Sequence, residues 1–260
     1  MCEYRPYVLL CACLITGLLT QVCHAAPLRL TLYLNIEARQ FLNATNQSIV
    51  IVVPDPSSEG DNSVVAINLP PPITDSMVVV IEPKTSIYVA HGVVSSAQAF
   101  KIGVSSPVLY GNAYSFNGYK INGNGKGKDG SVGIYYDAPP NAKPLITGQA
   151  LFIYDSDTGK PASPSPINGF TLNPFQSRYI SQPAAVIWAL IGSNISSGSV
   201  LPNSVLKSVS PYLSYANAST QGRSSFQISR YLEVPFNEQN QASIHFDLSL
   251  NAFECGPYPK

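Results

Sequence analysis

Residues suited to contacting a ligand are concentrated in one aromatic and glycine-rich stretch of the chain, 110–136. Aromatic rings offer flat apolar faces, and amide side chains nearby supply hydrogen-bond donors and acceptors, which suits sugar rings and protein surfaces alike. Two lysines in the loop 122–130 (NGNGKGKDG) add a possible contact to an anionic group. Tyrosine is also common in strands, so packing within a sheet is the competing interpretation. The candidate ligand-binding residues are Tyr110, Tyr114, Phe116, Tyr119, Lys126, Lys128, Tyr135 and Tyr136.

Groups able to act as nucleophiles or general bases are scarce. Beyond residue 25 the histidines are His91 and His245, and the cysteine is Cys255. No GxSxG stretch occurs, and the context of Cys255 (FECG) matches no thiol-protease signature. His245 and Asp247 share one face of a predicted strand and could exchange protons, although a mixed polar strand face explains them equally well. We therefore expect no catalytic residue and a non-enzymatic function.

Two loops match the start of a ligand-binding motif and then depart from it. The stretch 125–130 (GKGKDG) fits GxGxxG, but a β-rich segment follows where a dinucleotide site needs a helix. It predicts the tip of a hairpin instead. The stretch 155–159 (DSDTG) resembles the opening of a calcium loop, but Pro166 stands where the bidentate Glu is required. We therefore expect no metal site and no cofactor.

A secreted polysaccharide hydrolase is the alternative function. Such an enzyme needs two carboxyl groups about 5–10 Å apart in a cleft, and only the fold can bring them together. The carboxylates to examine are Asp129, Asp137, Asp155, Asp157 and Asp247.

The charge balance bears on the choice of partner. Lysine plus arginine and aspartate plus glutamate each number 15, so the formal net charge is zero, and only 12% of residues are charged. Without a basic run the chain lacks the counterion-releasing surface that nucleic-acid binding uses. The partners we expect are a neutral glycan or a protein surface, and self-association stays open.

Alternation of apolar residues predicts the positioning elements. The segment 28–34 (LRLTLYL) and the segment 244–250 each put apolar residues on every second position, which is typical of strands. Short β-branched runs at 49–53, 64–67 and 77–81 predict strands buried on both faces. The fold class predicted is all-β, an antiparallel sandwich of immunoglobulin-like or jelly-roll-like type, with little helix. Residues expected in its core are Leu30, Leu32, Leu34, Phe246 and Leu248.

The rest of the chain continues this pattern. The segment 184–191 (AAVIWALI) fits a strand better than a helix, and 204–210 could form one helical turn. Proline-rich stretches at 138–144 and 161–166 predict loops. The body 26–260 is predicted to be one sandwich, and two β subdomains divided near 138–146 or 160–168 are the open alternative. Further strands are predicted at 86–94, 99–104, 114–121, 131–136, 150–154, 169–172 and 226–234.

The first 25 residues predict a secretory signal peptide. Arg5 precedes an apolar run at 7–19, and Cys23, His24 and Ala25 end in a small-residue cleavage site. The run is too short for a spanning helix, which needs about 20 apolar residues, so no transmembrane segment is expected after cleavage. The sequence thus predicts an exported protein, secreted, periplasmic or at the cell surface. Its predicted role is binding or structural, as an adhesin-like, surface-associated or toxin-like β-module.

Processing gives the first testable prediction. Material recovered from the native host should begin at Ala26, because cleavage after Ala25 leaves a small residue on the amino side of the cut. Intact mass and N-terminal sequencing check this. A product that still carries Met1, or one that begins at a lipidated Cys23, contradicts the assignment.

Overall fold

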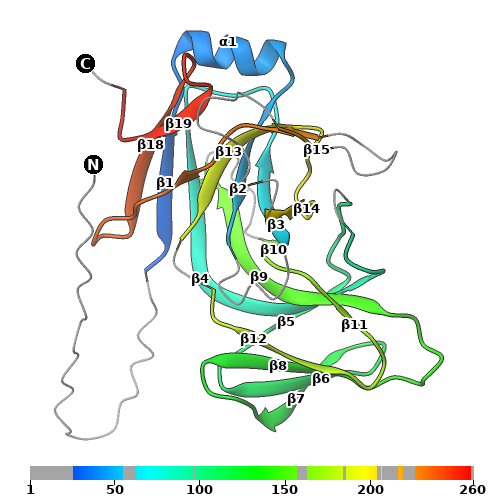
Figure 1. Cartoon of the computed structure of the whole chain (residues 1–260). Coiled ribbons are helices and arrows are strands. Elements are labelled where there is room, and N and C mark those ends of the chain that lie inside the picture. Colours follow the sequence, from blue (N-terminus) through cyan, green and yellow to red (C-terminus); the bar gives the residue numbers. More distant parts are fainter. Residues whose placement is uncertain are drawn as a thin grey trace, which may run out of the picture.

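The computed structural model describes residues 26–54, 62–95, 98–156, 163–183, 186–203, 206, 216–218 and 226–258 (Figure 1). The predicted signal peptide lies outside these residues, as does all of 204–210 except Leu206. Strands dominate the described part, in three sheets of eight, seven and four strands with mostly antiparallel pairing. The predicted all-β, sandwich-like fold is confirmed.

The eight-stranded sheet is built around the first and last long strands of the chain. Strand β1 (Leu28–Tyr33) lies parallel to β18 (Gln241–Asp247), with Leu32 opposite Ile244. On its other side β1 pairs antiparallel with β4 (Ser76–His91). Leu30, Leu32 and Leu34 of the first alternating segment are buried and Leu28 is half-buried. The two alternating segments of the sequence thus lie side by side in the main core.

The seven-stranded sheet faces this sheet across that core. Its central strands are β2 (Ser48–Val52), β3 (Asn62–Leu69) and β13 (Trp188–Ser193). Every residue of β2 is buried, because the sheet packs on both faces. This confirms the two-sided strands predicted from the β-branched runs, and the choice of a strand over a helix near residue 188. The remaining strands of this sheet are β14 (Val200–Pro202), β15 (Ala216–Ala218), β16 (Phe226–Ile228) and β17 (Leu232–Glu233).

Two long strands connect the upper and lower parts of the molecule in Figure 1. Strand β4 pairs with β9 (Leu145–Asp155) from Val79 to His91, with one irregularity between Glu82 and Thr85. Beyond this irregularity β4 is buried on both faces. The other members of the eight-stranded sheet are β5 (Val104–Pro107), β10 (Ser163–Pro166), β11 (Phe170–Leu172) and β19 (Ala252–Cys255).

The four-stranded sheet packs against the lower halves of β4 and β9. Its strand order is β12 (Ser177–Ser181), β8 (Ser131–Tyr136), β6 (Asn112–Phe116) and β7 (Ile121–Lys126). Strands β6 and β8 are parallel. The inner face of this sheet forms an apolar core with β4, β9 and β11, whose buried members include Ile87, Val89, Phe116, Val132, Ile134, Tyr136, Leu145 and Leu172.

One α-helix, α1 (Ile36–Ala44), lies in the described part of the chain, and the sequence analysis did not predict it. Its start is fixed by Asn35, whose Oδ1 accepts a hydrogen bond from the Ala38 N–H at 2.7 Å. Such a side-chain cap satisfies one of the free N–H groups of a helix N-terminus. Only Ala38 and Leu42 are buried in α1, so its apolar stripe is too narrow to stand out in the sequence.

The last alternating segment ends earlier than predicted. Strand β18 stops at Asp247, and a turn over 248–251 joins it to β19. Leu248 is half-buried, and Leu250 is 43% exposed. His245, expected on a solvated face, is buried at 5% exposure because β19 and the C-terminal segment cover it.

Three further predictions needed correction. The strands predicted at 77–81 and 86–94 are one continuous strand, β4. The segments predicted as one strand at 114–121 and a hairpin tip at 122–130 differ in the structure. Strand β6 ends at Phe116, and a second strand, β7, runs from Ile121 to Lys126 through part of the predicted tip. The predicted loop 161–166 contains the strand β10, which pairs with β9 alone at the edge of its sheet, where proline is tolerated.

A matched pair of leucine substitutions tests this packing. Leu32→Ala removes a side chain with no exposed surface and should lower the free energy of unfolding by about 2–5 kcal/mol. Leu250→Ala makes the same chemical change at the exposed turn and should change it by less than about 0.5 kcal/mol. Urea denaturation of both variants measures the difference. Equal losses at the two positions would contradict the placement of β1 in the core.

Candidate functional site

The outer face of the four-stranded sheet is the candidate functional site. Successive residues of a strand point to opposite faces, and the strand register assigns each side chain to one of them. Tyr179 lies opposite Gly133, which lies opposite Ala113. One step along the same face, Ser177 lies opposite Tyr135, Tyr135 opposite Ser115 and Ser115 opposite Asn122. The face therefore combines tyrosine, serine, asparagine, glycine and alanine, with no charged residue at these positions.

One edge of the Tyr179 ring lies over Gly133 of the neighbouring strand. A Cβ atom added at Gly133 would come within 2.9 Å of Tyr179 Cε1 and within 3.5 Å of the Ala113 Cβ. The absence of a side chain at Gly133 thus lets the ring rest over β8, while 52% of Tyr179 remains exposed. Gly133 and Ala113 leave a shallow surface on which the Tyr179 ring packs.

Exposed aromatic residues also flank one end of this sheet. Tyr119 lies between β6 and β7 and is 87% exposed. Phe175 lies between β11 and β12, is 53% exposed, and donates its N–H to the Tyr136 carbonyl at the end of β8. Of the seven exposed large hydrophobic residues in the described part of the chain, Leu109, Tyr119, Phe175 and Tyr179 belong to this sheet or its connections. The enrichment singles out this region of the surface.

The backbone at Phe175 is unusual. Residues 173–176 form a β-turn in which the Gln176 N–H donates to the Asn173 carbonyl at 3.1 Å. Pro174 occupies the second position, and Phe175 has a φ of 61° at the third. A turn with proline followed by a positive φ normally carries glycine at that third position. A bulky residue there is an exception that needs an explanation.

The structure divides the predicted ligand-binding residues into two groups. Four of them contact solvent around the sheet: Tyr135 is half-buried on the outer face, and Tyr119, Lys126 and Lys128 are exposed at its ends and edge. Lys126 ends the edge strand β7, on the opposite side of the sheet from Tyr179. Lys128 lies in the loop before β8, where its carbonyl accepts the Ser131 N–H.

The other four predicted residues pack inward. Phe116 and Tyr136 are buried with ring centroids 5.9 Å apart, and the Tyr136 hydroxyl donates to the Lys143 carbonyl. Tyr114 packs against the same core and its hydroxyl accepts the Leu109 N–H. These three rings are on the inner face of the sheet, where they hold it against β4 and β9.

Tyr110 belongs to a polar network between the sheets. Its hydroxyl accepts from Gln149 Nε2 at 3.2 Å and donates to Thr85 Oγ1 at 3.4 Å. Burial raises the pKa of the Tyr110 hydroxyl, and these two hydrogen bonds act in the opposite direction. Asn168 Oδ1 in turn accepts the Gln149 N–H, and the Tyr88 hydroxyl donates to the Asn168 carbonyl. The network serves packing by satisfying buried polar groups.

Sequence reasoning missed Tyr179 and Phe175. No strand was predicted at 177–181, because the segment SRYIS is short and has only Ile180 as an aliphatic residue. The signal available was the alternation of Ser177, Tyr179 and Ser181 with Arg178 and Ile180, combined with the Asn-Pro turn before it.

His245 and Asp247 have structural partners. His245 Nδ1 is 3.0 Å from the Gly256 carbonyl oxygen, and the centroids of the His245 and Tyr258 rings are 4.7 Å apart. Asp247 Oδ1 accepts hydrogen bonds from the Ser249 hydroxyl and from the N–H groups of Ser249 and Leu250. The Ser249 hydroxyl bond is the largest cause lowering the pKa of Asp247. The pair secures the turn between β18 and β19.

The remaining carboxylates considered for hydrolysis come from separate elements. Asp129 and Asp137 flank the two ends of β8, about 20 Å apart at the usual strand rise. Asp155 and Asp247 are separated by three strand spacings and five residues, also about 20 Å. Both separations exceed the 5–10 Å or so of glycosidase pairs. Asp157 lies outside the described residues.

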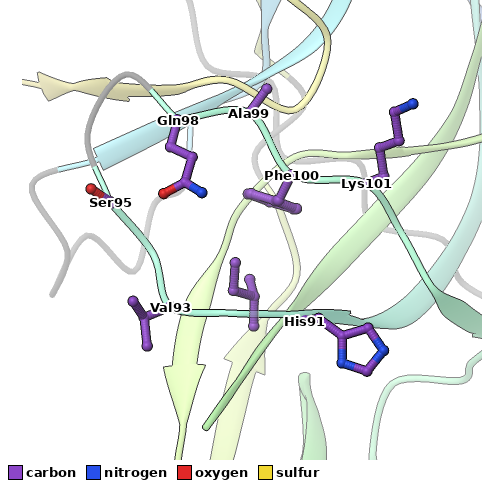
Figure 2. A pocket seen from close by; sticks show the side chains of 8 residues that line it. His91, Val93, Ser95, Gln98, Ala99, Phe100 and Lys101 are labelled. Carbon is purple, nitrogen blue, oxygen red and sulfur yellow. The ribbon is translucent and has the colours of Figure 1, made fainter. Parts of the chain in front are cut away.

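A cavity of about 280 Å³ lies at the end of β4 (Figure 2). In Figure 2 the Phe100 ring and the Gln98 amide point into the space, whereas the His91 imidazole and the Lys101 ammonium group point away from it. Val93 and Ile146 add to its apolar lining. The arrangement has one amide and no convergent acid–base pair among these residues.

The described residues hold no group of three or more metal-ligating side chains, and none of their helices has the length and apolarity to cross a membrane. Comparisons with protein-family models, curated proteins and solved structures gave no match. The candidate site therefore rests on geometry alone.

Tyrosine reactivity tests the assignment of faces. Nitration requires access and the phenolate form, so Tyr119 and Tyr179 should react first. Tyr88 should react last, because burial raises the pKa of its hydroxyl well above the usual value and shields the ring. Peptide mass spectrometry of partly nitrated native protein gives the order, with urea-unfolded protein as the control in which all sites react alike. Early nitration of Tyr88 in native protein would overturn the assignment.

Proposed function

We propose that this protein binds a neutral glycan on the outer face of the four-stranded sheet, without turning it over. The observation that supports this most is the chemical character of the face. Tyr135 and Tyr179 offer rings that can lie against the apolar face of a sugar, as aromatic side chains with a polar end do at wet interfaces. Serine and asparagine side chains beside them can donate to and accept from hydroxyl groups.

The lack of charge at these positions favours a neutral ligand. An anionic polysaccharide would be recognised by arginine or lysine converging on its acidic groups. Arg178 instead holds its guanidinium 3.8 Å from the centre of the Phe170 ring on the inner side of the sheet. Lys126 lies on the opposite edge strand from Tyr179, and Lys128 lies in the loop before β8 rather than at the outer-face positions. A neutral chain lying across β12, β8 and β6 fits this distribution best.

A flat face suits binding better than hydrolysis. Hydrolysis needs a cleft that holds two carboxyl groups on either side of one bond. Asp129 and Asp137, and likewise Asp155 and Asp247, are about 20 Å apart at the usual strand dimensions, which is too far for this role. The outer-face positions described above carry no carboxylate. An exported, surface-associated role agrees with the signal peptide predicted from the sequence, and remains part of the proposal.

Retention on immobilised polysaccharides tests the proposal. Purified 26–260 is run through native gels containing xylan, galactomannan or mixed-linkage glucan, with alginate as the anionic comparison. A neutral polysaccharide should retard the protein and alginate should not. Tyr179→Ala and Tyr135→Ala should each weaken retention roughly two- to tenfold, the equivalent of about 0.5–1.5 kcal/mol for one aromatic contact.

Tyr33→Ala is the matched control, since Tyr33 is a half-buried tyrosine on β1 in a different sheet. It should leave retention unchanged. Retention that survives both outer-face substitutions contradicts the proposed site. Release of reducing sugar that a single Asp→Asn substitution abolishes would replace binding by the hydrolase alternative.

A further inference from the structure

The sheet edges of this protein are protected unequally. An exposed edge strand offers unpaired N–H and C=O groups to other chains, and proteins usually blunt such edges with proline, lysine, bulges or short length. Edge strand β10 contains Pro164 and Pro166, and β14 ends in Pro202. Strands β15 and β19 have three and four residues. Strand β7 carries Lys126 and a pairing irregularity opposite 112–114.

Strand β12 has none of these protections. It is regular, has five residues without proline or lysine, and its neighbour in the sheet is β8 alone. Its ladder is extended by bonds of the Tyr136 N–H to the Gln176 carbonyl and of the Gln182 N–H to the Gly130 carbonyl. The charged residue within it, Arg178, is turned toward Phe170 on the inner side. Among the described residues, no strand pairs with the opposite backbone edge of 176–182.

The sequence of β12 is complementary to itself. If two copies pair antiparallel about a two-fold axis at Tyr179, Ser177 of one copy faces Ser181 of the other. Tyr179 then faces its own counterpart, and Gln176 faces Gln182. These are amide, hydroxyl and aromatic pairs, and aromatic and hydroxyl cross-strand pairs stabilise antiparallel sheets. No like charges meet, and the formal net charge of zero adds little long-range repulsion between copies.

We propose that β12 is a dimerisation edge that pairs with β12 of a second copy of this chain. A two-fold axis makes the interface use the same residues on both copies. The two four-stranded sheets then form one continuous eight-stranded sheet. This inference does not rest on the proposed glycan function, because it follows from the backbone edge and its register.

Phe175 gives an independent reason for the same interface. In the register centred on Tyr179, Phe175 of one copy lies opposite Pro183 of the other. Its ring, 53% exposed in the single chain, is then covered by an apolar neighbour. This accounts for a phenylalanine in a backbone conformation that favours glycine. Local strain of this kind persists where function requires it.

A charge-pair experiment tests the register. Ser177→Lys with Ser181→Lys puts two like-charged pairs across the interface, whereas Ser177→Lys with Ser181→Asp puts two opposite-charged pairs there. Both positions are exposed, so the two double variants should fold alike by circular dichroism and thermal unfolding. Sedimentation equilibrium of 26–260 should give twice the chain mass for the wild type and the Lys/Asp variant. The Lys/Lys variant should dimerise at least tenfold more weakly, and added salt should narrow the gap between the two variants.

Each other outcome overturns the proposal. A wild-type protein that is monomeric at all concentrations shows that the edge is not used. A Lys/Lys variant that dimerises as strongly as the Lys/Asp variant places any dimer interface elsewhere. Phe175→Gly provides a second measurement. In the Lys/Lys variant it should raise the thermal midpoint, because glycine relieves the backbone strain at this position. In the wild type it should weaken dimerisation, because the ring no longer contacts the second copy. An unchanged dimerisation constant in Phe175→Gly contradicts the register that places Phe175 opposite Pro183, and with it the proposed pairing.

Discussion

Every layer of this molecule depends on the ladder between β4 and β9. The two strands align from Val79–Asp155 to His91–Leu145 and supply side chains to three cores. On β4, Ile87 and Val89 face the four-stranded sheet, while Tyr88 and Ala90 face β3 and β14. The ladder also sets a close backbone approach at Gly148, where an added Cβ would lie 2.3 Å from the Asn168 carbonyl oxygen. A side chain at Gly148 would force β9 away from Asn168 and disturb the surface against which the four-stranded sheet packs.

The four-stranded sheet has one buried and one open face, and that asymmetry creates the candidate site. Its inner face needs large apolar side chains, so Phe116, Ile134 and Tyr136 face the core. Its outer face has no packing partner in the described part of the chain, and the residues there follow other requirements. Small residues such as Ala113 and Gly133 let the Tyr179 ring lie low across β8. A sheet covered on both sides would have had no room for such a ring.

Period-2 alternation and β-branched runs made much of the fold predictable from sequence. Strands β1, β2, β3, β8 and β13 stand out because burial on one or both faces dictates their residue types. Helix α1 was not predicted, because its two buried residues leave almost no 3.6-residue apolar pattern in the sequence. The aromatic stretch 110–136 contributes to both faces of the four-stranded sheet, because successive residues of one strand face opposite ways. Only the register separates Tyr135 from Tyr136, and register depends on pairing partners distant in the sequence.

The parallel pairing of β1 with β18 has a consequence for the order of events in folding. Strand β18 lies between β1 and β19 inside the sheet, and the hydrogen bond from the Asn35 N–H to the Tyr258 hydroxyl spans 223 positions of sequence. A growing chain therefore exposes the free edge of β1 until β18 has been made. Long-range pairing of this type slows folding, because a large loop must close before the contacts form. Completion of the main core therefore waits for residues 241–247, and a chain that lacked them would keep the pairing of β1 with β4 but leave its other edge unpaired.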